Sequence, residues 1–286
     1  MILAIASGKG GTGKTTISTA LAIVAKQKVN YFDCDVEEPN GMIFLKPISV
    51  TSDVSFSKVP QIDTDKCTGC GECESFCQFN AIITLAGRTM VMNEMCHACT
   101  GCSYVCPKSA ISFVPFRMGE INKGMLRTSS GSEINIVSGV LDIGRTMSPP
   151  LIRQVKKDIQ DQELNIIDCP PGSSCPMLTA VDGADYVILV TEPTPFGLHD
   201  LSIAVDTLRV MHIPFGVIIN KSGIGDSCVV DYCQNEGIDI LAQIDSMIEV
   251  AKQYSEGVNI LAQITEVTES LKKILEKITA GYCEGV

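Results

Sequence analysis

Apolar residues follow two patterns along this chain, and each pattern predicts a different kind of element. Uninterrupted apolar runs at residues 2–6 and 186–190 predict buried β-strands. Near the end of the chain, apolar residues recur at helical spacing and form a stripe that consists of Leu271, Ile274, Leu275 and Ile278. The lysines beside this stripe leave two interpretations, a closing helix packed on the core or a basic amphipathic helix on a membrane surface. We favour the packed helix, because the stripe is short and nearby glutamates dilute the positive charge.

The first apolar run leads directly into a glycine-rich loop with the phosphate-binding pattern Gly-x4-Gly-Lys-Thr. The glycines of such a loop let backbone N–H groups surround phosphate oxygens, and the helix that follows points its positive end at them. The predicted phosphate-binding residues are Gly8, Gly10, Gly11, Thr12, Gly13, Lys14, Thr15 and Thr16. We expect Lys14 to reach the β- and γ-phosphates of a nucleoside triphosphate and the Thr15 hydroxyl to bind Mg²⁺.

Lys9 adds a second lysine near the start of this loop, which therefore resembles the deviant Walker A motif of the MinD/ParA family of dimeric ATPases. In that family the additional lysine crosses the dimer interface and neutralises charge on the partner's phosphates during hydrolysis. The resemblance implies an ATPase that forms a nucleotide-dependent homodimer, with Lys9 and Lys14 among its catalytic residues. A solvated loop lysine is the alternative for Lys9.

Two later segments extend the resemblance to the magnesium site and the attacking water. The run Val-Asn-Tyr-Phe-Asp-Cys-Asp is similar to the family's second strand, which implies that Asp33 supports Mg²⁺ and that Asp35 is the catalytic residue that positions the water. The run Leu-Asn-Ile-Ile-Asp-Cys-Pro-Pro-Gly resembles the Walker B strand and switch II. There the resemblance implies that Asp168 holds Mg²⁺ through water and that the Gly172 amide senses the γ-phosphate. An ordinary turn residue at the end of a strand is the alternative for Asp168.

The resemblance also implies the fold and the base site. The expected fold is α/β, with a mostly parallel P-loop NTPase sheet, helices on both faces, and phosphates at the carboxyl ends of the strands. Asn220 lies in the run Val-Ile-Ile-Asn-Lys, where the family recognises the base, and a simple strand cap is the alternative for it. The chain departs from the family at Ile244 and Asp245, where many relatives have Ile-Pro. The sequence therefore specifies phosphate binding more firmly than the choice of base.

Eight of the fourteen cysteines form a duplicated iron–sulfur motif. The run C-x2-C-x2-C-x3-C occurs twice, with every cysteine of the second copy shifted by 29 positions. This is the pattern of two-cluster bacterial ferredoxins, in which the fourth cysteine of each run serves the other [4Fe–4S] cluster. The predicted ligands of cluster one are Cys67, Cys70, Cys73 and Cys106. The predicted ligands of cluster two are Cys96, Cys99, Cys102 and Cys77.

Thiolate sulfur suits iron, and glycines beside the cysteines let backbone amides approach the cluster sulfurs. Zinc is the alternative metal, but two interleaved runs of this spacing favour iron–sulfur clusters. His97, between two of these cysteines, is expected to be a neighbouring donor or a surface residue rather than a ligand. We predict an inserted α+β two-cluster ferredoxin domain at residues 58–116, within an ATPase domain of residues 1–57 and 117–286.

Six cysteines remain outside the motif: Cys34, Cys169, Cys175, Cys228, Cys233 and Cys283. Cys175 lies seven residues after Asp168, at a place similar to that of a cluster-ligating cysteine in the nitrogenase iron protein, a distant relative of the family. Two interpretations stay open, a small semi-buried residue, which we favour, and a metal or cluster port at the dimer interface.

Charge and segment lengths limit the partners and the compartment. The formal net charge of −11 disfavours nucleic acid as a partner, because no basic patch offsets it. The first apolar run is too short for a signal peptide, and no run reaches the length of a membrane span. The sequence therefore predicts a cytoplasmic protein whose cysteines are metal ligands or free thiols rather than disulfides.

Three functions remain open, and all use ATP, magnesium and two [4Fe–4S] clusters as cofactors. The leading hypothesis is an ATPase that acts in iron–sulfur cluster or metallocofactor assembly, with an iron–sulfur or redox protein as acceptor. The second is ATP-gated low-potential electron transfer that resembles the nitrogenase iron protein. The third is a MinD-like spatial organiser with redox-sensing clusters. The acidic charge and the short C-terminal stripe count against the third function and disfavour a membrane partner.

Overall fold

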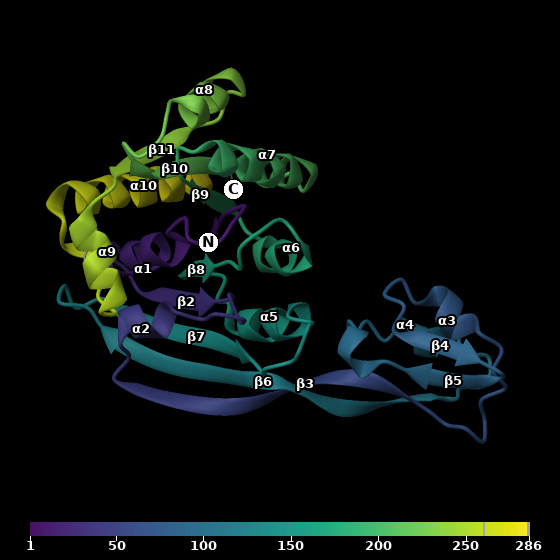
Figure 1. Ribbon diagram of the computed structural model, residues 1–286. Helices are drawn as coiled ribbons and strands as arrows, with labels where there is room; N and C mark the ends of the chain where they lie inside the picture. Colours follow the sequence, from purple (N-terminus) through teal and green to yellow (C-terminus); the bar gives the residue numbers. More distant parts are fainter. Residues whose placement is uncertain (260, 285–286) are drawn as a thin grey trace.

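Nine strands form one sheet in the order β11-β10-β9-β1-β8-β2-β7-β6-β3 in this computed structural model, which describes residues 1–259 and 261–284 (Figure 1). Every neighbouring pair from β11 to β7 is parallel, whereas β6 and β3 run antiparallel at one edge. The strands are β1 (Ile2–Ala6), β2 (Val29–Asp33), β3 (Ser49–Ile62), β6 (Ile111–Arg127), β7 (Glu133–Leu141), β8 (Leu164–Asp168), β9 (Tyr186–Thr191), β10 (Phe215–Ser222) and β11 (Ile240–Asp245). The mostly parallel sheet expected from the sequence is confirmed.

Helices cover both faces of the sheet (Figure 1). On one face lie α1 (Lys14–Val24), α2 (Gly41–Leu45), α9 (Ile248–Ser255) and α10 (Thr265–Glu284). On the other face lie α5 (Pro149–Val155), α6 (Cys175–Val181), α7 (Pro195–Val210) and α8 (Cys228–Asn235). Short 3₁₀ helices lie at Asn93–Met95, Lys156–Asp158 and Leu261–Gln263. A cluster of buried apolar side chains on each face joins the layers, which explains why the central strands are mostly apolar.

The C-terminal apolar stripe belongs to the core, and the prediction of a packed closing helix is confirmed. Its four members lie in α10, pack on the α1 side of the sheet and are each 7% exposed or less; they are Leu271, Ile274, Leu275 and Ile278. Among the helices of the described residues, none is long and apolar enough to cross a membrane.

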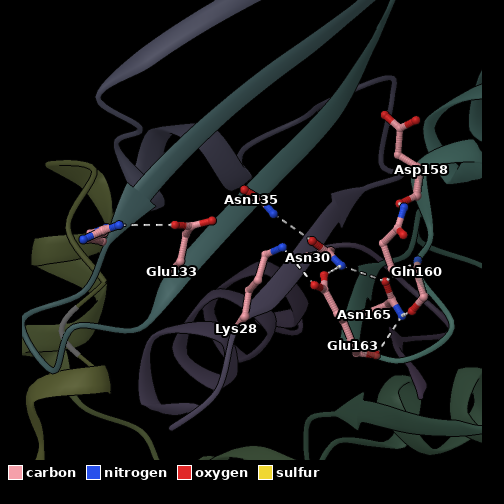
Figure 2. A network of polar contacts seen from close by, with 9 residues as sticks. Lys28, Asn30, Glu133, Asn135, Asp158, Gln160, Glu163 and Asn165 are labelled. Carbon is pink, nitrogen blue, oxygen red and sulfur yellow. Dashed lines mark hydrogen bonds and ion pairs between the residues drawn. The ribbon is translucent and has the colours of Figure 1, made fainter.

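A ladder of asparagines joins the amino-terminal halves of three neighbouring strands (Figure 2). Asn135 Nδ2 donates to Asn30 Oδ1 at 3.0 Å, and Asn30 Nδ2 donates to Asn165 Oδ1 at 3.2 Å. These bonds support the register of β7, β2 and β8, because only one alignment places the three amides side by side. Three residues further along β2 and β8, the same register sets Asp33 beside Asp168.

The cysteine-rich insert lies at the end of a long ribbon formed by β3 and β6 (Figure 1). Its other elements are α3 (Glu72–Phe76), β4 (Ile82–Leu85), β5 (Arg88–Val91) and α4 (Gly101–Tyr104). The duplication in the sequence reappears in these elements, because α4 begins 29 residues after α3 and β6 begins 29 residues after β4. Each half of the insert is therefore one strand–helix–strand unit.

The predicted limits of the insert, residues 58 and 116, fall inside two continuous strands. Ser57 pairs with Phe116 and Lys58 pairs with Pro115 in a ladder that runs from the main sheet into the insert. Paired strands restrain each other more than a flexible linker would. The division into two domains stays a prediction, and the connection between the two parts is a continuation of the sheet.

Candidate functional site

The phosphate loop between β1 and α1 depends on Gly13. Its φ of 97° lies in the left-handed region, and a Cβ at this position would stand 2.3 Å from Asn220 Nδ2. Asn220 Nδ2 donates to the Thr12 carbonyl at 2.8 Å, and Lys221 Nζ donates to the Gly11 carbonyl at 2.7 Å. The end of β10, with the predicted base-site residue Asn220, thus lies directly against the loop.

The interior of the loop is polar and in part unpartnered. Lys14 begins α1 and is buried, and the buried Thr12 hydroxyl has no hydrogen-bond partner among the described residues. A buried ammonium and a free hydroxyl at the start of a helix suit an anionic ligand. The other predicted phosphate-binding residues occupy the loop and the first turn of α1; they are Gly8, Gly10, Gly11, Gly13, Thr15 and Thr16.

Lys9 is held within its own chain by an ion pair with Glu192, which directly follows β9. Lys221 pairs with the same carboxylate at 3.3 Å. Burial acts to raise the pKa of Glu192, but hydrogen bonds from Lys9 and Lys221 outweigh it, so the pKa lies below its usual value. Sequence analysis missed Glu192 and Lys221, because nothing in their own segments shows that they meet the phosphate loop.

Asp33 and Asp168 end the neighbouring strands β2 and β8, and both are completely buried. The Gly41 N–H donates to Asp33 Oδ2 at 2.8 Å, and the Tyr31 hydroxyl donates to Asp168 Oδ2 at 3.1 Å. The Oδ1 atom of each aspartate has no partner among the described residues. Burial, followed by the charge of Asp168, raises the pKa of Asp33, and burial also raises the pKa of Asp168.

Two neighbouring buried carboxylates with unpartnered oxygens are unfavourable unless a cation lies beside them. Mg²⁺ prefers carboxylate, hydroxyl and water oxygens. Thr15, in the first turn of α1, acts to lower the pKa of Asp168, which places its hydroxyl close to the same carboxylate. The predicted magnesium residues Thr15, Asp33 and Asp168 therefore fit a divalent cation.

Asp35 follows Asp33 by two residues in the chain, and Gly172 follows Asp168 by four. Burial raises the pKa of Asp35 to about 7, against the opposing charge of Lys14. The Gly172 amide, expected to sense the γ-phosphate, donates to the Ser7 carbonyl at 3.0 Å in this structure. Gly172 has to leave Ser7 before its N–H is free for a phosphate oxygen.

A cavity of about 330 Å³ opens beside the phosphate loop, between the end of β10 and α9. Gly13, Thr16 and Asn220 line its polar side, and Val250 and Tyr254 line its apolar side. Its size lies at the lower end of the usual range for small-molecule sites, and a flat base with its sugar fits such a mixed lining. Asn220 is thus in place to contact a base.

The eight motif cysteines separate into two groups of four around two cavities. The first cavity is lined by Cys67, Cys70, Cys73 and Cys106. The second is lined by Cys77, Cys96, Cys99 and Cys102, together with Phe76, Phe79 and Phe113. The fourth cysteine of each run lies with the other run, as the ferredoxin pattern implies.

Within the described residues, no group of three or more His, Cys, Asp or Glu side chains is close enough to hold a metal ion. A [4Fe–4S] cluster places each thiolate on a different iron, so its ligands surround the cluster instead of meeting at one ion. The two rings of four cysteines fit that chemistry, whereas a zinc site would need the four thiolates to converge.

The structure also places the histidine and the remaining cysteines that the sequence singled out. His97 stacks on Phe79 with ring centroids 3.6 Å apart and lines the second cavity. Cys175 is exposed at the start of α6, so the expectation of a semi-buried residue is wrong, because α6 turns its first residue away from the core. Cys34 and Cys169 are buried in the core, and the side chain of Cys283 lies outside the described residues.

Comparisons with known proteins agree with this geometry. Residues 3–260 match the family model of the CobQ/CobB/MinD/ParA nucleotide binding domain. An uncharacterised protein of Methanocaldococcus jannaschii is 28% identical over 232 residues, which cover 79% of this chain and 82% of that protein. An iron–sulfur cluster carrier protein of Helicobacter pylori is 24% identical over 265 residues, which cover 88% of this chain and 54% of that protein. The septum site-determining protein MinD of Pyrococcus horikoshii, solved with Mg-ADP, shares the fold, with a TM-score of 0.57, 20% identity and coverage of 97% and 95% of the two chains.

Proposed function

The chain belongs to the CobQ/CobB/MinD/ParA nucleotide-binding family, and we propose that it is a Mg²⁺-dependent ATPase acting in iron–sulfur cluster or metallocofactor assembly. The observation that carries the ATPase part is the buried pair Asp33 and Asp168, whose Oδ1 atoms have no partner among the described residues and whose member Asp168 is close enough to Lys14 and Thr15 to be affected by them. This arrangement is stabilised when a cation and the phosphates it accompanies are bound.

Each residue has a separate task in this proposal. Lys14 neutralises the β- and γ-phosphates, and Thr15, Asp33 and Asp168 hold Mg²⁺, which would offset phosphate charge. Asp35, as a carboxylate, accepts a hydrogen bond from the attacking water and orients it toward the γ-phosphorus.

Lys9 is proposed to exchange Glu192 for the phosphates of a second copy of the chain. Its side chain is 29% exposed, so it is accessible from a facing surface. Exposed apolar side chains follow the carboxyl ends of three strands, and they support a contact with a second copy; they are Ile143, Phe196 and Ile224. In this proposal, nucleotide binding joins two copies of the chain into a homodimer through this surface.

The iron–sulfur part of the proposal rests on the two rings of four cysteines. The similarity to a protein named as an iron–sulfur cluster carrier supports a role in handling clusters. The insert is joined to the nucleotide-binding sheet by the paired strands β3 and β6, so a change in the sheet has a direct route to the clusters. The acceptor is proposed to be an iron–sulfur or redox protein.

ATP-gated electron transfer is the second candidate, and the burial of two predicted ligands favours it. Cys73 is 7% exposed and Cys102 is 8% exposed, so each ring has one ligand buried inside the insert, which favours retention of the cluster, whereas Cys70 and Cys99 are exposed. A MinD-like spatial organiser with redox-sensing clusters is the weakest candidate, because the apolar stripe of α10 is buried in the core and is not available to a membrane surface.

One transfer experiment distinguishes the first two candidates. Anaerobically purified protein is mixed with an apo-ferredoxin acceptor, and iron in each protein is measured with and without MgATP. ATP-dependent arrival of iron on the acceptor supports assembly, whereas retained iron with an ATP-dependent change of oxidation state supports electron transfer. The Lys14→Ala variant is the matched control, because it keeps the cysteines and removes the phosphate-binding lysine. Absence of both clusters and of ATP hydrolysis in the wild type would contradict the proposal.

A further inference from the structure

The two cysteine rings of the insert differ in how the rest of the chain holds them. The Arg153 guanidinium, on α5, donates to the His97 carbonyl at 3.1 Å, between two ligands of predicted cluster two. The Thr146 hydroxyl donates to the Glu94 carbonyl at 3.1 Å, just before the same ligands. Among the described residues, the side-chain hydrogen bonds of the Cys67–Cys77 segment stay within the insert. Beyond the β3–β6 ribbon that carries both rings, the side-chain hydrogen bonds of the described residues tie the ring of cluster two to the nucleotide-binding part.

Arg153 brings a positive charge that no carboxylate offsets. The nearby Arg145 lies 3.8 Å from the Glu94 carboxylate, so that pair is close to neutral. Arg153 has no ion-pair partner in the described part of the chain. Its guanidinium reaches the ring of cluster two through the hydrogen bond to the His97 carbonyl, which lies between the ligands Cys96 and Cys99.

The second cavity has a mostly uncharged lining, which increases the effect of a nearby charge on cluster two. Aromatic and small side chains line that cavity, and no Asp, Glu, Lys or Arg is among its lining residues in the described chain. The first cavity, by contrast, includes Glu72 and Lys108 in its lining. Charges interact more strongly in apolar surroundings, because the effective dielectric constant is lower there. Arg153 is itself exposed, so solvent screens part of its charge, but the bond to the His97 carbonyl holds its guanidinium at the edge of this cavity.

The opposite side of α5 packs against the segment that follows Asp35. The Leu141 N–H donates to the Val36 carbonyl at 2.8 Å. A Cβ on Gly139 would stand 2.6 Å from Val36 and 2.8 Å from Val155 of α5, so these elements touch closely. A shift of the chain after Asp35 therefore presses on α5 directly.

We propose that Arg153 is a positioning residue that makes the reduction of cluster two depend on the nucleotide state. Reduction adds one electron, supplied by a low-potential one-electron donor, and converts [4Fe–4S]²⁺ to [4Fe–4S]⁺. The Arg153 charge stabilises the more negative reduced form, and it moves with α5 when the segment after Asp35 rearranges around bound nucleotide. This inference rests on the proposed function, because it requires both clusters and a nucleotide.

The test is a redox titration with dithionite, monitored by electron paramagnetic resonance, on the full-length protein purified anaerobically. It is repeated with a non-hydrolysable MgATP analogue and with Arg153→Gln, Arg153→Lys and Lys108→Gln. Arg153→Gln is expected to lower the reduction potential of one cluster and to remove that cluster's response to nucleotide. Arg153→Lys keeps the charge, so the reduction potential of cluster two should stay close to its wild-type value. Lys108→Gln should lower the reduction potential of cluster one alone.

Two outcomes would overturn the inference alone. If both clusters of Arg153→Gln keep the wild-type reduction potentials, the Arg153 charge has no role. If the reduction potentials of both clusters shift equally, the substitution has loosened the whole insert instead. A wild type that contains no clusters would overturn the proposed function as well, so iron content is measured first. Circular dichroism of each variant checks that the fold is retained.

Discussion

Asp33 lies directly beside Asp168 at the carboxyl ends of two parallel strands, and each keeps one carboxylate oxygen without a partner among the described residues. Both are completely buried, so each makes the other harder to ionise in the absence of a cation. The nucleotide-free protein is therefore less stable at this site than a protein with bound Mg²⁺, and binding and stability are coupled there.

Replacing Asp168 by Asn should stabilise the protein without ligand and abolish the stabilisation by MgADP. A raised folded pKa means that stability falls as pH rises above the unfolded pKa, so the penalty of the wild-type pair is present at pH 8. At pH 8 the melting temperature of the variant should exceed that of the wild type, by about 2–4 °C for each kcal/mol gained in the free energy of unfolding. Thermal melts at pH 8 with and without MgADP measure both effects. Equal MgADP stabilisation of variant and wild type would contradict the magnesium assignment.

Hydrolysis of ATP should rise with pH through the titration of Asp35. Burial raises the pKa of Asp35 to about 7, and only its carboxylate form accepts a hydrogen bond from the attacking water. The rate at saturating MgATP should therefore increase between about pH 6 and pH 8 and then level off. Asp35→Asn should bind nucleotide but hydrolyse it slowly at every pH. Normal hydrolysis by that variant would remove Asp35 from the mechanism.

The interleaved cysteine pairing predicts which substitutions remove the same cluster. Cys77→Ser and Cys96→Ser should both abolish the electron paramagnetic resonance signal of reduced cluster two, although the two cysteines belong to different runs. Cys106→Ser should abolish the other signal. Iron should fall from about eight to about four atoms per chain in each variant. Cys228→Ser, outside both rings, is the control, and loss of different signals in Cys77→Ser and Cys96→Ser would refute the pairing.

Asn165→Ala should destabilise the fold without touching the nucleotide site. Asn165 is completely buried, and its Nδ2 donates to the carbonyls of Met1 and Gln160 at 3.2 and 2.7 Å (Figure 2). Removing it leaves buried acceptors unpaired, at a cost on the order of 2–4 kcal/mol. Urea unfolding measures the change, and the exposed Asn235→Ala on α8 serves as the matched control. A loss no larger than that of the control would show that the ladder contributes little.

Sequence and structure contribute different parts of the nucleotide site. The glycine loop, Lys14 and the two strand-end aspartates are recognisable in the sequence, because each belongs to a short continuous motif. The ion pair of Lys9 with Glu192 is not recognisable, since the partners are far apart in the chain and meet only when β9 lies beside β1. The bond of the Gly172 amide to Ser7 depends on the same folding.

The insert shows the same division. The spacing of the cysteines determined the two groups of four and the duplication of 29 residues, because local turns set the distance between neighbouring ligands. The exposure of Cys175 and the contact of Arg153 with His97 were decided by the tertiary structure. Local spacing specifies a motif, whereas the register of the sheet and the placement of α5 specify which distant side chains face that motif. The sequence by itself therefore determined the two kinds of site, and only the fold decided how they are joined.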